Sequence, residues 1–124
     1  VVLVTGVGSV WTNDIGLNVG ASGRANRLVV SNGGAVVVFT SAYLGLNSLS
    51  RDNVAEVMGA GSLWAIQSEL RVGGNSAGNR LMVSDGGVVR NNTGYLGHFS
   101  TQSSNNVAMV TGVGSLWSNR TDLI

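Results

Sequence analysis

The chain of 124 residues contains no cysteine, no proline and no lysine, and it has a single histidine. The absence of cysteine excludes disulfides, thiolate zinc sites and cysteine nucleophiles. Charged residues make up 10% of the chain and hydrophobic residues 44%, a balance that argues against intrinsic disorder. The formal net charge is +1 and the seven arginines are scattered, so no basic tract favours nucleic acid or an anionic membrane surface.

Long apolar segments are also absent. The longest apolar run, Ala35 to Phe39, is far shorter than the roughly 20 residues of a membrane-spanning helix. The sequence shows no opening segment in which basic residues precede an apolar stretch. We therefore expect no insertion into a membrane, and the length fits one domain at most.

An internal repeat dominates the sequence. Three segments read VTGVGSVW (Val4–Trp11), VMGAGSLW (Val57–Trp64) and VTGVGSLW (Val110–Trp117), and their tryptophans are 53 residues apart. Half of this period is also present, because four asparagines recur at spacings of 27, 26 and 27 residues: Asn26, Asn53, Asn79 and Asn106. A glycine column follows eight residues after each of them: Gly34, Gly61, Gly87 and Gly114, with Gly8 in the same column of an earlier, partial unit.

Each unit of about 26 residues, here called a rung, contains three short stretches of alternating apolar residues, separated by Gly, Asn and Ser. This pattern predicts an all-β fold, a parallel β-solenoid (β-helix) of four to five rungs with three short strands per rung. We expect one domain, residues 1–124, built from 53-residue double repeats: a partial rung 1–25 and rungs starting near 26, 53, 79 and 106. A β-propeller would need more units, and a β-sandwich lacks such regular columns.

The strand that follows each repeated asparagine has two predicted faces. The asparagines themselves are expected to form an amide ladder at a corner, and the glycine column a tight or left-handed corner. The second and fourth positions after each asparagine are expected in the core, and the alternate positions outside. The outward face is unusually apolar and we expect it to pack against another copy; this association face contains Leu3, Val29, Met82 and Met109, with Arg27, Arg80 and Glu56.

A further column, counted from the asparagines, reads Trp11, Val37, Trp64, Arg90 and Trp117. Two interpretations stay open. In the first, Trp64 and Trp117 are core or corner residues that fill the volume left by the small Ala55 and Ala108 of their own rungs. In the second, Trp64, Arg90 and Trp117 form an exposed platform for sugar rings, with the arginine between two indoles.

The sequence contains few residues that could form a catalytic site. His98 is the only histidine, so it cannot form a histidine pair for a metal, and no serine and carboxylate columns accompany it. Glu69 and Asp122 share a column two rungs apart, about 10 Å, which approaches the separation in an inverting glycosidase, but no third group supports them. We predict no catalytic residue, no cofactor and no metal site.

The strings GNRLMVSDGG (Gly78–Gly87), LRVGG (Leu70–Gly74) and NNVAMVTGVGSLW (Asn105–Trp117) resemble the repeats of bacterial autotransporter-like passenger domains. The resemblance covers nearly the whole chain and implies an exported parallel β-helix, secreted or at the cell surface, that acts as an adhesin, stalk or coat. Neither end shows a cap, so the ends either pair with another copy or belong to a longer repeat array.

Two functions follow as hypotheses. The first is a non-enzymatic structural or adhesive β-solenoid that forms a homo-oligomer through open end rungs or the apolar sheet face. The second is a carbohydrate-binding or polysaccharide-processing β-helix that uses the Trp and Arg column to bind a glycan or another cell-surface ligand.

Overall fold

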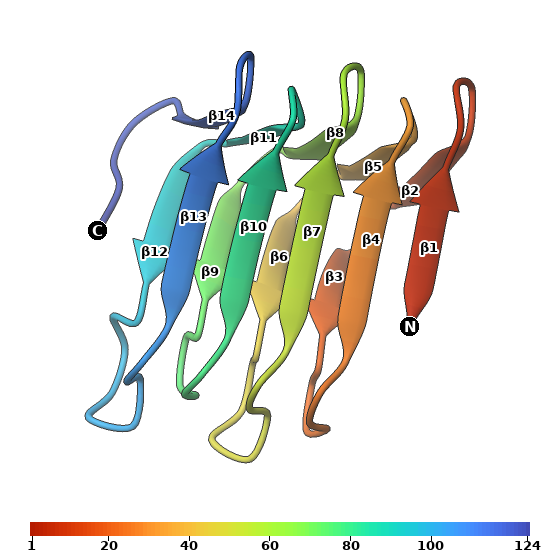
Figure 1. The fold of residues 1–124 in the computed structure, drawn as a ribbon. Coiled ribbons are helices and arrows are strands. Elements are labelled where there is room, and N and C mark those ends of the chain that lie inside the picture. The colour runs from red at the N-terminus through yellow and green to blue at the C-terminus, as the bar shows by residue number, and fades with distance from the viewer.

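The computed structural model describes all residues from 1 to 124 and confirms the predicted all-β parallel solenoid. Fourteen strands and no helix form three parallel sheets that run along the axis of the coil. The chain completes about five rungs, and each rung contributes one strand to each sheet, except that the last has only an isolated bridge in the third sheet. The coil is right-handed (Figure 1), as expected for parallel strands joined by crossovers.

The sheets are numbered in the order in which the chain enters them. The strands of sheet 1 are β1 (Val2–Thr5), β4 (Arg27–Ser31), β7 (Val54–Met58), β10 (Arg80–Ser84) and β13 (Val107–Thr111). The strands of sheet 2 are β2 (Val10–Asn13), β5 (Ala35–Val38), β8 (Leu63–Ile66), β11 (Val88–Asn91) and β14 (Leu116–Asn119). The strands of sheet 3 are β3 (Gly16–Val19), β6 (Ser41–Leu44), β9 (Glu69–Val72) and β12 (Thr93–Leu96).

The core is a column of aliphatic side chains between the three sheets. In sheet 1 the second and fourth positions after each repeated asparagine point inward as predicted, and Leu28, Ala55 and Leu81 stack in register on successive strands. The alternation of buried and outward residues within each strand is the period of two that a pleated strand imposes. Burying one such leucine contributes about 1.5 to 3 kcal/mol, so stability comes from the repetition of many modest terms.

The corner between sheets 1 and 2 alternates in length from rung to rung. The odd rungs use four-residue turns such as Gly59 to Ser62, and the even rungs use three-residue turns such as Asn32 to Gly34. The glycine column was correctly predicted to need glycine. In the odd rungs Gly61 has φ of +81°, and in the even rungs a Cβ on Gly34 would lie 2.6 Å from the carbonyl oxygen of Val4.

The corner between sheet 3 and the next rung holds the predicted asparagine ladder. The Oδ1 atom of Asn79 accepts hydrogen bonds from the Nδ2 and the backbone N–H of Asn53, at 3.0 and 3.2 Å, and Asn79 donates in the same way to Asn106. Asn26 repeats the pattern with Asn53. Asn53 and Asn79 are fully buried, so the ladder satisfies polar groups that water does not reach.

A serine column supports the ladder. Ser76 lies three residues before Asn79, accepts a hydrogen bond from its Nδ2 at 2.9 Å and donates to the carbonyl oxygen of Gly45 at 2.9 Å. Ser50 makes the same bonds with Asn53 and Gly20. Sequence reasoning missed this column, although Ser50, Ser76 and Ser103 recur at nearly the same spacing as the asparagines.

Candidate functional site

The predicted association face is the outer surface of sheet 1. Cross-strand pairing places Leu3, Val29, Glu56, Met82 and Met109 in one row that crosses all five strands. Leu3 is 59% exposed and Met109 44% exposed, and the residues between them are half-buried by their neighbours in the row. The row is therefore a flat, largely apolar strip whose side chains point away from the core.

The charges on this face are partly compensated within it. Arg27 Nη2 lies 2.5 Å from Glu56 Oε2, across neighbouring strands. Arg80 occupies the equivalent place on the other side of Glu56, is exposed, and makes no ion pair. The face thus presents apolar side chains around one closed ion pair and one free guanidinium.

The predicted platform of Trp64, Arg90 and Trp117 is wrong. Trp64 pairs in register with Val89, and Trp117 with the same valine from the other side, whereas Arg90 pairs with Ala65 and Ser118. Because the even rungs have the shorter turn, the count from the asparagines is one residue too long, and a one-residue shift exchanges the two faces of a strand.

The tryptophans belong to the core, as the first interpretation holds. Trp64 is 0% exposed, and Trp117 is partly buried against the core. Trp117 Nε1 donates to Asn91 Oδ1 at 2.7 Å, whereas the buried Nε1 of Trp64 has no partner. A buried tryptophan cannot stack on a sugar ring, so this column is not a ligand platform.

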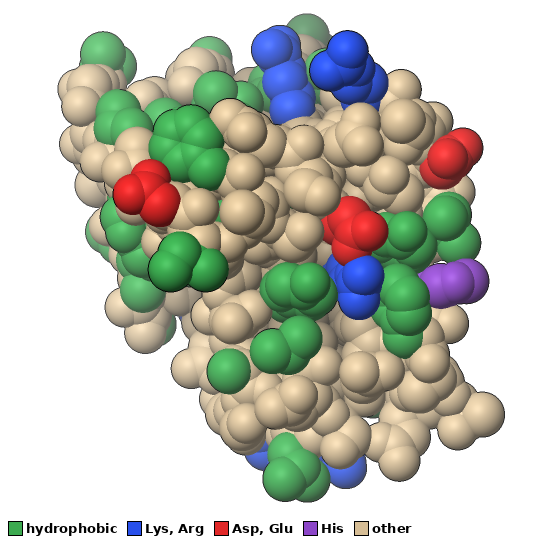
Figure 2. Space-filling view, turned by 180° about the vertical axis from the view of Figure 1, so that it is seen from behind, with side chains coloured by type: hydrophobic (Ala, Val, Ile, Leu, Met, Phe, Trp, Pro, Cys, Tyr) green, Lys and Arg blue, Asp and Glu red, His purple; other side chains and the backbone are tan.

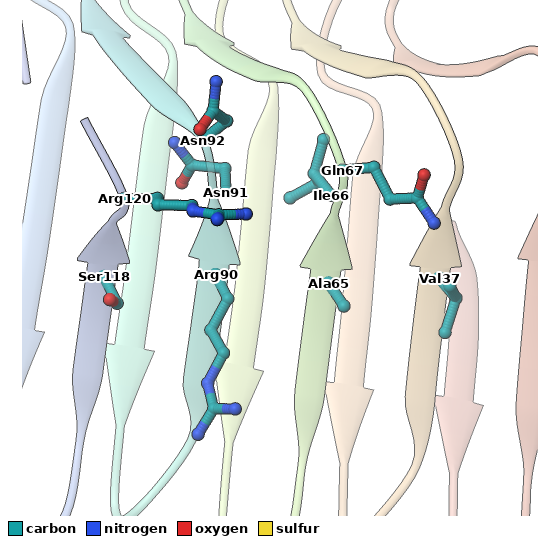
Figure 3. Close-up of a pocket in the computed structure, with 9 residues that line it drawn as sticks. All are labelled: Val37, Ala65, Ile66, Gln67, Arg90, Asn91, Asn92, Ser118 and Arg120. Carbon is teal, nitrogen blue, oxygen red and sulfur yellow. The ribbon is translucent and has the colours of Figure 1, made fainter. Parts of the chain in front are cut away.

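Arg90 instead lines a shallow groove on the outer surface of sheet 2. The groove has a volume of about 520 Å³, and Figure 3 shows its lining residues on β5, β8, β11 and β14 and the turns after them. Arg90 and Arg120 are exposed and neither makes an ion pair. With Gln67 and Asn92 they give the groove hydrogen-bond donors and positive charge, an arrangement suited to an anionic group.

An aromatic cluster occupies the outer surface of sheet 3. Tyr43, Arg71 and Tyr95 are consecutive in one outward row, and the guanidinium of Arg71 lies 5.3 Å from the ring centre of Tyr43 and 5.4 Å from that of Tyr95. Phe99 adds a third ring, 4.1 Å from the same guanidinium. These distances are within the range of cation–π contacts.

Glu69 holds the arginine in place. Its Oε2 atom accepts hydrogen bonds from Arg71 Nε at 2.9 Å and Nη2 at 2.5 Å, so the charge of the arginine is neutralised beside the rings. His98 packs on the edge of the cluster, with its ring centre 4.9 Å from that of Phe99. Figure 2 shows this side of the molecule, with an acidic and a basic side chain adjacent among hydrophobic side chains and the histidine at the edge.

A polar groove adjoins the aromatic cluster at the corner that follows sheet 3. Its volume is about 440 Å³ and its lining contains only hydroxyl and amide side chains: Asn47, Ser48, Asn75, Ser100, Thr101 and Gln102. Phe99 immediately precedes Ser100, and the backbone N–H of Phe99 donates to the carbonyl oxygen of Gly74, next to Asn75, at 3.2 Å. The cluster and the groove therefore form one continuous surface.

No group of three or more His, Cys, Asp or Glu side chains comes together in the fold, and no helix has the length and apolarity needed to cross a bilayer. A scan of protein-family models, a search of curated proteins and a search of solved structures each found no match to this chain.

Proposed function

We propose that the chain is a non-enzymatic structural or adhesive β-solenoid that associates with a second copy through the association face. The observation that carries the proposal is the outward row of Leu3, Val29, Met82 and Met109 on a flat five-stranded sheet. Contiguous apolar patches on the surface of a soluble protein commonly mark interaction sites.

A second copy is the partner that fits this face best. Side-chain rows on both copies repeat at the same spacing of about 4.8 Å, so the rows of one sheet interdigitate with those of the other. The ion pair of Arg27 and Glu56 is closed within each copy, so the two strips meet without separating it. This complementarity is what an isologous interface requires.

The area of the association face sets the expected affinity of self-association. Five strands of four or five residues cover about 400 Å², roughly half of the 800 Å² that each partner buries in a standard interface. Association of this chain alone is therefore weak. It strengthens in an array with more rungs, because each rung adds contacts without a new loss of translational freedom.

The end rungs are a poorer route to association. Inner rungs alternate between Ala55 with Trp64 and Leu81 with Val89, whereas Trp11 and Trp117 place a tryptophan in both the first and the fifth rung. Head-to-tail stacking of two copies would bring two tryptophan rungs together and break the alternation. We therefore assign association to the sheet face.

The resemblance of the repeats to autotransporter-like passenger domains supports a secreted or cell-surface location for such a scaffold. At a surface, many weak copies side by side give a coat or an adhesive layer, because linked weak contacts add up to a strong total. In this proposal the repeated outward rows of side chains make the contacts between copies.

Sedimentation equilibrium tests the proposal with the pair of substitutions Met82→Lys and Met109→Glu, which places the new lysine between Glu56 and the new glutamate. These residues are cross-strand neighbours, so the new charges pair with each other and the fold is kept, while the apolar strip is interrupted. The control carries Val37→Lys and Ala65→Glu, a matched cross-strand pair on the outside of sheet 2 in which the new glutamate lies between the new lysine and Arg90. We expect the unaltered chain and the control to self-associate at concentrations approaching about 1 mM, and the test variant to stay monomeric. A chain that is monomeric throughout, or a test variant that associates like the control, contradicts the proposal.

A further inference from the structure

We propose that the aromatic cluster of sheet 3 and the adjoining polar groove bind a neutral oligosaccharide. The site consists of Tyr43, Arg71, Tyr95 and Phe99 with the hydroxyl and amide side chains of the groove. It lies on a different sheet from the association face, so the proposal goes beyond the proposed function and can be tested independently of it.

The aromatic part of the site is ordered before any ligand arrives. Arg71 is fixed by Glu69 and lies between the rings of Tyr43 and Tyr95, which keeps all three side chains in the same orientation. The two tyrosines are two rungs apart, about 10 Å, a length comparable to two linked sugar rings. Phe99 is 40% exposed and offers the most accessible ring. Rigid aromatic faces of this kind contact the apolar face of a sugar with little loss of side-chain freedom.

The charge balance favours a neutral ligand. Arg71 and Glu69 cancel each other at the cluster, and the groove is lined by hydroxyl and amide side chains. Arg51 lies only in the neighbouring groove, which shares Ser48 and Gln102 with it. The groove side chains both donate and accept hydrogen bonds, as sugar hydroxyls do. An anionic ligand is better served by Arg90 and Arg120 on sheet 2, which have no carboxylate partner. The hydroxyl and amide side chains of the groove suit the hydroxyl groups of a sugar better than the apolar core of a protein interface.

The loop geometry joins the two parts into a site long enough for an oligosaccharide. Ser103 Oγ donates to the carbonyl oxygen of Gly74 at 2.7 Å, which ties the loop after β12 to the loop after β9. The tie brings Ser100 and Asn75 together in the groove, directly beyond Phe99. A ligand can therefore stack on the rings at one end and form hydrogen bonds at the other.

Titration followed by nuclear magnetic resonance tests the site. Cellohexaose, N-acetylchitohexaose and mannohexaose are added separately to the ¹⁵N-labelled chain, and a heparin-derived hexasaccharide serves as the anionic comparison. We expect at least one neutral hexasaccharide to shift the amide signals of residues 95 to 102, and the anionic one to leave them unchanged. A shift caused only by the anionic hexasaccharide, or no shift with any neutral one, overturns the proposal.

Variants separate stacking from hydrogen bonding. Phe99→Ala removes an exposed ring and is expected to weaken binding about tenfold. Gln102→Ala removes an exposed amide from the groove and is expected to weaken binding by a smaller factor, roughly threefold. The control is Phe39→Ala, an exposed phenylalanine outside the cluster, which is expected to bind like the unaltered chain. Equal binding by all three variants overturns the proposal even if a sugar binds elsewhere.

Discussion

The two corners that flank sheet 1 hold their register by different means. At the corner before it, loops of different length, such as Gly73 to Asn79 and Gly97 to Asn106, end on the same asparagine ladder. At the corner after it, no side chain repeats in every rung and the turn length alternates instead. The first corner therefore uses the same asparagine in every rung, whereas the second alternates a three-residue turn with a four-residue turn whose serine accepts a hydrogen bond from the neighbouring rung.

The two corners accommodate changes of length in different ways. A residue inserted into a loop before the ladder changes only the loop, because the next asparagine still bonds to its neighbours. The turn after sheet 1 absorbs a one-residue change by itself, because the three-residue and four-residue turns both lead into strands that pair in register, as Leu63 does with Val88. Trp64 and Arg90 lie equally far from their ladder asparagines, but Trp64 faces inward and Arg90 outward because the turn before Arg90 is one residue shorter.

The largest expected effect comes from breaking the ladder. Asn79→Ala removes the oxygen that accepts from the backbone N–H and Nδ2 of the buried Asn53, and it removes one of the two donors to Asn106 Oδ1. We expect the free energy of unfolding to fall by about 3 to 5 kcal/mol, measured by urea denaturation. Asn18→Ala, an exposed asparagine on β3, serves as the control and should change it by less than about 0.5 kcal/mol. Equal losses in the two variants would show that the ladder adds no stability.

A second prediction concerns the alternation of core volume. Trp64→Val leaves a cavity and is expected to cost about 3 kcal/mol, and Ala55→Leu alone overfills the rung and is expected to cost about 1 to 3 kcal/mol. Combined, the two substitutions convert rung three to the even type, in which Leu81 and Val89 share the core. We expect the loss in free energy of unfolding of the double variant to be about 1 to 3 kcal/mol smaller than the sum of the two single losses. If urea denaturation showed that the two single losses simply add in the double variant, complementary packing would be contradicted.

The smallest effect is expected at the backbone of the ladder corner. The residue before each ladder asparagine has a positive φ. One of these positions is occupied by an alanine, Ala25 at +54°, and another by a glycine, Gly78. Ala25→Gly should raise the free energy of unfolding by about 0.5 to 1 kcal/mol, since glycine adopts this conformation without strain. Thermal unfolding measures it as a small rise in Tm. A lower Tm would mean that Ala25 is not strained.

Much of the fold was predictable from the sequence because its columns repeat. Sheet 1 was placed with the correct register: the ladder asparagines, the inward Leu28 and Ala55, and the outward Met82 and Met109 all lie where the spacing puts them. Sheet 2 was predicted one residue out of register in the even rungs, because a shared glycine column hid the difference in turn length. Turn geometry, not side-chain pattern, decides that register.

The aromatic cluster was only partly accessible to sequence reasoning. Tyr43, Arg71 and Tyr95 each lie two residues before a repeated glycine, so their common outward column could have been found. Phe99 and His98 lie in the longest loop and have no counterparts in other rungs. Their contact with the column depends on how that loop folds back, which no repeat encodes.

The most direct test of the register between the odd and even rungs of sheet 2 is a set of cross-strand nuclear Overhauser contacts between β8 and β11. The account predicts contacts that pair Trp64 with Val89 and Ala65 with Arg90, together with tryptophan indole signals that contact core methyl groups. Contacts that pair Trp64 with Arg90 instead would contradict it, since they would return the arginine to the tryptophan column and reverse the two faces of sheet 2.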